Sequence, residues 1–368
     1  MSIKLKKSTL AKGFMLFVIL SLAVMVGILL WTTDHETWNY MTRFHWGYIP
    51  VLVLLGIVRW FFDGKAFVTM AKHGSNSTIA IHKAAIIRLE GTLVASVVPV
   101  LVGTFSMHAY LLHKEKLRLH ESVAITVLRA ILPVFLFLLN IPILIYMKTD
   151  PNGGKFFTEF LKVISLPVVA VIVFFVYTLF YPEKIKGWAS RIVRWYGRHK
   201  KKHIDRVISF EKKMLFEIDQ FSQVFWQYVR KKKWMMVKAT FWICLAFIAD
   251  YVIALIVLWG FGYHPPIIKA LAIQFLMRPI IYFAMTPGGA GIWEFTYLGF
   301  FSLYMPQQII GISVLIWRLL VTYLPCVAGA FFLSREFGQD SDLKNIIFGQ
   351  GRLPDEELEL NKQNISQV

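Results

Sequence analysis

The 368-residue sequence contains little charge and little cysteine. Only 17% of its residues are charged and 57% are hydrophobic, whereas about a quarter of an ordinary soluble domain is charged. A soluble protein of this length needs a more polar surface than this composition provides. The two cysteines, Cys244 and Cys326, both lie within apolar runs, so we expect no disulfide framework.

Catalytic and cofactor motifs are also lacking. The ten histidines are scattered, and no Cys/His/Asp cluster has the spacing of a metal site. The sequence has no Gly-x-Ser-x-Gly motif, no Walker loop and no dinucleotide fingerprint. We therefore expect no enzyme, no metal site and no cofactor, and we do not expect ATP-driven transport by this chain alone.

Long apolar runs are the main feature that the sequence does have. About twenty apolar residues cross a hydrocarbon core of about 30 Å, and such runs recur along the chain. Two further runs, 84–112 and 267–304, are apolar but broken by proline and glycine. The predicted fold class is an all-α integral membrane protein with about six full spans, at residues 13–31, 48–62, 122–147, 164–181, 235–260 and 308–333.

The formal net charge of +18 is concentrated in short segments that flank the apolar runs. This distribution follows the positive-inside rule and not the pattern of a groove-binding patch, so we expect no nucleic-acid partner. The rule places both termini in the cytoplasm, and we expect a bacterial-type inner (plasma) membrane. Residues 1–335 are predicted to form one membrane domain, followed by an acidic cytoplasmic tail, 336–368.

The basic segment 182–234 is inserted into the membrane domain, and its apolar residues recur at helical spacing. One interpretation is an amphipathic helix on the anionic cytoplasmic leaflet. The other is a cytoplasmic loop packed on the helix bundle.

The two broken runs are predicted to be re-entrant hairpins. Basic residues flank 84–112 on both sides, so a single crossing would leave one basic loop outside; a turn near Pro99–Gly103 resolves this conflict. Arg129 follows Pro99 by 30 residues, and Arg318 follows Pro287 by 31. Because the two units have opposite orientations, they predict an inverted-topology repeat around a midplane transport site. The alternative is a chance alignment of common residues.

Charged residues inside the apolar runs are expensive, at about 2.5–3.5 kcal/mol each at the bilayer centre, and need an explanation. We expect Arg59 and Asp63 to pair with each other and Asp250 to have an interhelical partner. The other charges predict a polar cavity for a phosphate or zwitterionic headgroup, because arginine binds phosphate through two parallel hydrogen bonds. The candidates are Arg88, Glu90, Arg129, Arg278, Glu294 and Arg318, with backbone donors from Gly288, Gly289 and Gly291. The alternative is that Arg–Glu pairs only hold the hairpins together.

The run Thr286-Pro-Gly-Gly-Ala-Gly-Ile-Trp-Glu294, followed by Trp317-Arg318 and Leu324-Pro325, resembles a known signature. It is similar to the flippase-like membrane family related to the lipid-flipping transmembrane region of lysylphosphatidylglycerol synthetase, the multiple peptide resistance factor. The similarity covers about residues 10–335. It implies that a lipid is moved between leaflets, and it carries over Pro287, Gly288, Gly289, Gly291, Glu294 and Arg318 as site residues.

The chain departs from the family pattern in two places. The segment Pro99-Val-Leu-Val-Gly103 lacks the second glycine and the nearby acidic residue, and His108 and Tyr110 stand where a basic residue often follows. About thirty-five residues follow residue 333, too few for the synthetases' soluble aminoacyl-transfer domain, so we do not expect synthesis of an aminoacyl lipid.

We therefore predict a lipid translocase (flippase) for an anionic or aminoacylated phospholipid or a lipid-linked molecule. One rival is a secondary transporter of a small anion. Another is a non-transporting membrane scaffold for a lipid- or glycan-modifying enzyme, docking through 182–234. The predicted partners are membrane lipids, with a homo-oligomer and a lipid-modifying enzyme as further candidates.

Overall fold

The computed structural model describes residues 7–42, 44–75, 77–97, 100–148, 204–282 and 284–339, together with scattered positions between 155 and 193. Within this part of the chain all regular structure is helical, which confirms the all-α class. The predicted acidic tail beyond residue 339 and most of the predicted span 164–181 lie outside the described residues.

Three helical segments are long and apolar enough to cross a membrane. They are the main part of α1 (Lys7–Thr32), α11 (Lys233–Gly260), and the continuous path of α14 (Gln307–Arg318), η3 (Leu319–Tyr323) and α15 (Leu324–Gln339). One face of α1 exposes Leu16, Ile19, Leu22, Val26 and Leu30. An apolar face of this size suits lipid and not water. The chain is a multi-pass membrane protein; six spans stay a prediction.

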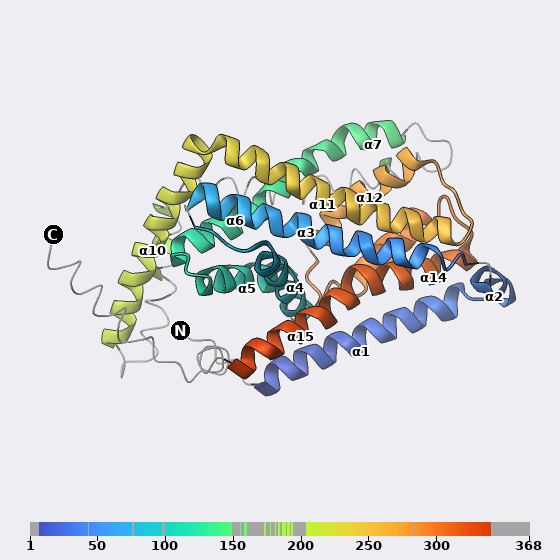
Figure 1. Cartoon of the computed structure of the whole chain (residues 1–368), viewed down its shortest axis with the longest axis horizontal. Coiled ribbons are helices and arrows are strands. Elements are labelled where there is room, and N and C mark those ends of the chain that lie inside the picture. The colour runs from blue at the N-terminus through green and yellow to red at the C-terminus, as the bar shows by residue number, and fades with distance from the viewer. Residues whose placement is uncertain are drawn as a thin grey trace.

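The centre of the bundle is an antiparallel pair, α3 (Tyr48–Gly74) and α11, which lie side by side (Figure 1). At one end the N–H of His45 donates to the carbonyl of Gly260 at 2.8 Å. At the other end Ser75, directly after α3, contacts Tyr228, which lies five residues before α11 begins; their hydroxyl groups are 2.6 Å apart. With 27 residues, α3 is about 40 Å long at about 1.5 Å per residue, so it is also long enough to cross.

The first broken run forms two helices, α4 (Ile81–Val97) and α5 (Val100–Lys114), which pack against each other. An ion pair of 2.8 Å between Lys83 and Glu115 brings the start of α4 and the end of α5 to the same end of the bundle. Each helix is only about 22–26 Å long, less than the hydrocarbon thickness of about 30 Å. Pro99, in the predicted turn, lies outside the described residues.

The second broken run forms α12 (Ile267–Tyr282) and α13 (Ile292–Phe301), with the glycine-rich turn between them. The N–H of Gly288 in this turn donates to the carbonyl of Ala95 at 3.0 Å. The inner end of α4 therefore meets the glycine turn of the second run inside the bundle.

The predicted span 122–147 is a broken path in the structure. It consists of α6 (Leu119–Leu136), the short 3₁₀ segment η1 (Phe137–Leu139) and α7 (Asn140–Lys148). Pro133 lies inside α6 and has no N–H to donate, which weakens the helix just before the change to 3₁₀ geometry.

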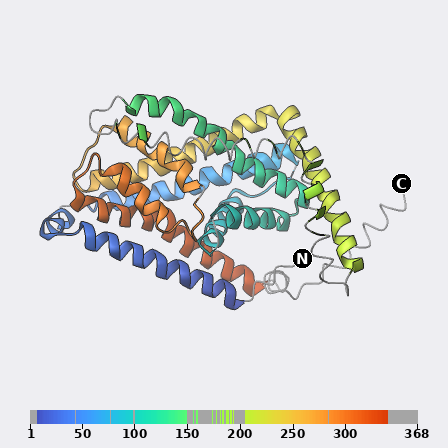
Figure 2. The same ribbon diagram turned by 180° about the vertical axis from the view of Figure 1, so that it is seen from behind.

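Two shorter or peripheral helices complete the described fold. A short helix, α2 (His35–Thr42), follows α1. A long helix, α10 (Ile204–Lys231), occupies the basic segment where the periodicity predicts it and crosses one end of the bundle (Figure 2). Its C-terminal part buries Phe225 and Tyr228, whereas Phe216 is exposed.

The hydrophobic core is divided into two clusters, and α3 and α11 contribute to both. One cluster contains Leu52 of α3 and Ile253 of α11. The other contains Phe67 of α3 and Ile243 of α11. Between the two clusters α3 carries Arg59 and Asp63 and α11 carries Asp250, and these charged residues belong to the site described next.

Candidate functional site

Two buried aspartates mark the polar layer between the clusters. Asp63 on α3 is 3% exposed and Asp250 on α11 is 2% exposed. Arg59, one turn before Asp63, pairs instead with Asp250, at 3.5 Å from Nε to Oδ1. The expectation that Arg59 and Asp63 pair with each other is therefore wrong, because Arg59 reaches across to α11.

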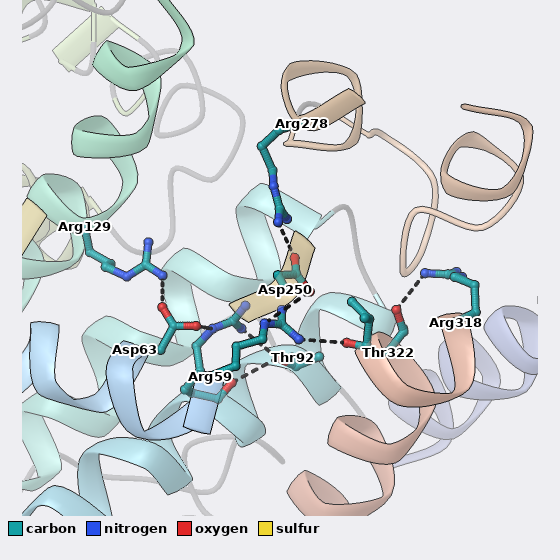
Figure 3. A network of polar contacts seen from close by, with 10 residues as sticks. Arg59, Asp63, Thr92, Arg129, Asp250, Arg278, Arg318 and Thr322 are labelled. Atoms are coloured by element: carbon teal, nitrogen blue, oxygen red, sulfur yellow. Dashed lines mark hydrogen bonds and ion pairs between the residues drawn. The ribbon is translucent and has the colours of Figure 1, made fainter. Parts of the chain in front are cut away.

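Each aspartate holds two arginines (Figure 3). Asp63 accepts from the Nε of Arg88 on α4 at 3.2 Å and from Arg129 on α6. Asp250 pairs with Arg59 and accepts from Arg278 on α12. The structure thus supplies the interhelical partner predicted for Asp250. Four helices from both halves of the chain bring their arginines to one polar layer on α3 and α11.

All four arginines line one cavity of about 130 Å³. Their side chains are only 9–20% exposed. Four guanidinium groups face two carboxylates here, which leaves two positive charges in excess. An arrangement of this kind attracts an anion, because a charge in a water-poor cavity is screened much less than one at the surface.

The arginines keep free donors while they are held in place. A guanidinium carries five N–H donors, and the Nε of Arg129 has no hydrogen-bond partner in the described part of the chain. Arg278 lies over the rings of Phe247 and Tyr251, at 4.6 and 5.2 Å from their centroids. Ion pairs and ring contacts therefore fix the planar groups in the orientation needed to donate to phosphate or carboxylate oxygens.

A smaller cavity, about 60 Å³, shares Arg59 and Arg88 with the first and extends toward Gly288. His108 lines the larger cavity and is almost fully buried. Its ring packs against Gly91 of α4, where a Cβ atom would overlap the imidazole. Among the described residues no group of three or more metal-ligating side chains is found.

Glu294 and Arg318 are not among the residues that line either cavity, although Arg318 contacts residues that do. Both are completely buried, and Nε of Arg318 is 2.7 Å from Oε1 of Glu294. Arg318 also donates to Thr322 at 2.8 Å and to the carbonyl of Gly288 at 3.3 Å. Thr322 belongs to η3, a π-helical segment that begins directly after Arg318. These contacts fasten the glycine turn to the following helix; direct contact of this pair with a headgroup stays a prediction.

The glycine turn itself uses left-handed backbone geometry. Gly288, Gly289 and Gly291 have φ angles of 58°, 67° and 84°, which residues with a Cβ atom adopt at a cost. A Cβ at Gly288 would in addition overlap the ring of Phe17 on α1. Pro287 opens the turn, and its carbonyl accepts from the N–H of Ala290 at 3.1 Å.

The three glycine N–H groups donate within the protein. Gly288 donates to Ala95, Gly289 to Thr286 at 2.9 Å, and Gly291 to Oε2 of Glu294 at 2.8 Å. The expectation that they donate to a headgroup is wrong for this conformation, because each has an acceptor already. The turn instead caps α13 and joins it to α4.

Among the predicted site residues, the structure brings Arg88, Arg129 and Arg278 together at the cavity. Glu90 is fully buried on α4 but is not among the residues that line the cavity. The prediction missed Arg59, Asp63 and Asp250 as members of the site. Their position inside apolar runs could have identified them, because a charged residue within a membrane segment usually indicates a functional site.

Comparison with known proteins identifies the family of this chain. The family described as the lysylphosphatidylglycerol synthase TM region matches residues 18–329, which confirms the resemblance of the 286–294 run. A UPF0104 membrane protein from Archaeoglobus fulgidus is 20% identical over 341 residues, covering 90% of this chain and 99% of the relative. No solved structure matches. The chain belongs to the lysylphosphatidylglycerol synthase transmembrane-region family.

Proposed function

We propose that this protein is a lipid translocase, which binds the phosphate of a membrane-lipid headgroup in the four-arginine cavity while the acyl chains stay in the bilayer. The observation that carries the proposal is the cavity, where four largely buried arginines, 9–20% exposed, lie beside two aspartates between the two halves of the bundle. Charged side chains in the interior of a membrane protein cost free energy, and binding of an anionic ligand would explain why four arginines lie here.

A pseudo-symmetric arrangement around the cavity supports transport. In the first half, Asp63 of α3 holds Arg88 of α4; in the second half, Asp250 of α11 holds Arg278 of α12. Because α3 and α11 are antiparallel, the two units have opposite orientations, as an inverted-topology repeat requires. We propose that α4–α5 and α12–α13 are re-entrant hairpins that enter from opposite sides and meet at Ala95 and Gly288.

The proposed orientation places both termini and α10 on the cytoplasmic side of a bacterial-type inner membrane. The last turn of α10 contains Arg230 and Lys231, and such basic residues attract anionic headgroups of that leaflet. In this proposal the protein carries the headgroup without modifying it, so it is not an enzyme. Membrane lipids are its proposed partners.

Transfer of a fluorescent lipid tests the proposal. Liposomes would hold the purified protein and a phosphatidylglycerol labelled on an acyl chain, and external dithionite would bleach only label that reaches the outer leaflet. We expect nearly complete bleaching with wild type and about tenfold slower transfer with Arg129→Gln, since a lost charged hydrogen bond costs about 1.5–3 kcal/mol. Asp63 keeps Arg88 in that variant, so no unpaired carboxylate is created.

The matched control is Arg335→Gln, the same substitution at an exposed position near the end of α15. It should transfer lipid like wild type. Bleaching of only the outer-leaflet label by wild-type liposomes, as in protein-free liposomes, would contradict the proposed function for that lipid.

A further inference from the structure

We infer that the cavity takes a lipid phosphomonoester, a headgroup that ends in phosphate, and rejects headgroups that carry an ammonium group. This inference rests on the proposed function and names its substrate class. It is carried by the charges, partners and size of the cavity.

The charge excess of the cavity fits a doubly charged anion. Two of the four positive charges are balanced by Asp63 and Asp250, and two remain. A phosphomonoester carries about −1.5 to −2 charges at pH 7. A phosphodiester carries a single negative charge; one ammonium group on an aminoacyl ester cancels it, and the two ammonium groups of a lysyl ester give the headgroup a net positive charge. The phosphomonoester therefore complements the cavity best.

None of the described residues that line the cavity supplies a carboxylate for an ammonium group. Asp63 and Asp250 are each ion-paired with two arginines already. Two aromatic rings of the cavity wall are already in contact with a cation: Arg278 lies over Phe247 at 4.6 Å, and Arg318 lies over Trp293 at 5.1 Å. An incoming ammonium would meet four guanidinium groups and be repelled.

The size of the cavity leads to the same ligand. The cavity has a volume of about 130 Å³, so it has room for a group larger than a single water. A phosphate group fills such a space with its own oxygens and brings several acceptors to the remaining guanidinium N–H groups. An aminoacyl ester would have to extend beyond the arginines.

Transfer of three labelled lipids in matched liposomes tests this class: phosphatidic acid, phosphatidylglycerol and lysylphosphatidylglycerol, each followed by dithionite bleaching. We expect phosphatidic acid to move fastest and the lysyl lipid at least about tenfold more slowly, the effect of one charged hydrogen bond. Equal or faster movement of the lysyl lipid would overturn the inference and leave the translocase standing. No movement of any lipid would overturn the translocase itself.

A parallel assay separates the lipid from a soluble source of the same chemistry. Uptake of radiolabelled inorganic phosphate into the same liposomes should equal that of protein-free liposomes. Protein-dependent phosphate uptake without lipid movement would overturn the lipid as ligand and assign the cavity to a small anion.

Adding one carboxylate to the cavity wall tests the charge argument directly. Thr104 lines both cavities and is not fully buried. In Thr104→Glu the charge excess falls to one and an ammonium gains an acceptor, whereas Thr104→Gln has nearly the same shape without the charge. The preference for phosphatidic acid over the lysyl lipid should fall about tenfold or more in the Glu variant relative to the Gln variant. An equal preference in the two variants would overturn the charge argument.

Discussion

Replacing Arg318 by methionine should destabilise the fold of the second broken run. Methionine keeps an unbranched apolar side chain but removes the guanidinium that contacts Glu294, Thr322 and the carbonyl of Gly288. Both members of the ion pair are fully buried. The substitution therefore leaves a carboxylate in the interior with only one described partner, the N–H of Gly291.

Removing one partner of a buried ion pair costs about 3–5 kcal/mol, because the other charge stays buried and unpaired. A typical protein has only about 5–15 kcal/mol of net stability, so the loss is severe. Glu294→Gln should cost less, since its amide oxygen still accepts from Gly291 and Arg318 keeps its other contacts. The double variant Arg318→Met/Glu294→Gln buries no charge at this place and should be more stable than Arg318→Met alone by about 1–3 kcal/mol.

Labelling of Cys326 measures this loss. Its thiol is 4% exposed and lies on α15, eight residues after Arg318, so a maleimide dye reaches it only when this region opens. Labelling rates against temperature in detergent give the order wild type, Glu294→Gln, double variant, Arg318→Met, from most to least stable. If Arg318→Met is as stable as wild type but no longer transfers lipid, the fastening role is refuted and Arg318 is a headgroup ligand.

Two further predictions concern the glycine turn and α10. Gly291→Ala should cost about 1–2 kcal/mol for its left-handed backbone alone, since its Cβ has space, whereas Gly288→Ala should cost more because its Cβ also overlaps Phe17; thermal midpoints in detergent would rank the two. Tyr228→Phe should cost about 1 kcal/mol by removing the 2.6 Å contact with Ser75. Burial raises the pKa of Tyr228 from 10 to about 12, so docking of α10 should be complete below pH 10 and weaken as pH rises toward 12. Tryptophan fluorescence should show this change in wild type but not in the Phe variant.

Local sequence patterns predicted the interruptions of the two broken runs and the helix α10. The interruptions of the two broken runs follow from proline and glycine, which act within a few residues, and the structure separates α12 from α13 at the predicted turn. The amphipathic α10 likewise follows from the spacing of its own apolar residues. Such signals need no knowledge of which helix lies beside which.

The partners of the charged residues could not be predicted in the same way. Arg59 and Asp63 are neighbours on one face of α3, and their spacing favours a local pair. The observed partner of Arg59 is Asp250, on a different helix far along the chain. Helix register and crossing geometry decide such pairs, and neither is visible in one sequence. For the same reason, the acceptors of the glycine N–H groups cannot be predicted from one sequence: the N–H of Gly288 donates to the carbonyl of Ala95 on α4.

In the proposed function, the two aspartates allow the cavity to hold a headgroup without trapping it. Four isolated arginines at this depth would cost about 10–14 kcal/mol on insertion scales, and sharing two carboxylates among them lowers that cost. Each arginine nevertheless keeps N–H donors, because one carboxylate cannot satisfy two guanidinium groups. An incoming phosphate therefore adds to the ion pairs and does not have to replace them. When it leaves, Asp63 and Asp250 still hold the arginines in place, so the empty cavity stays ready for the next headgroup.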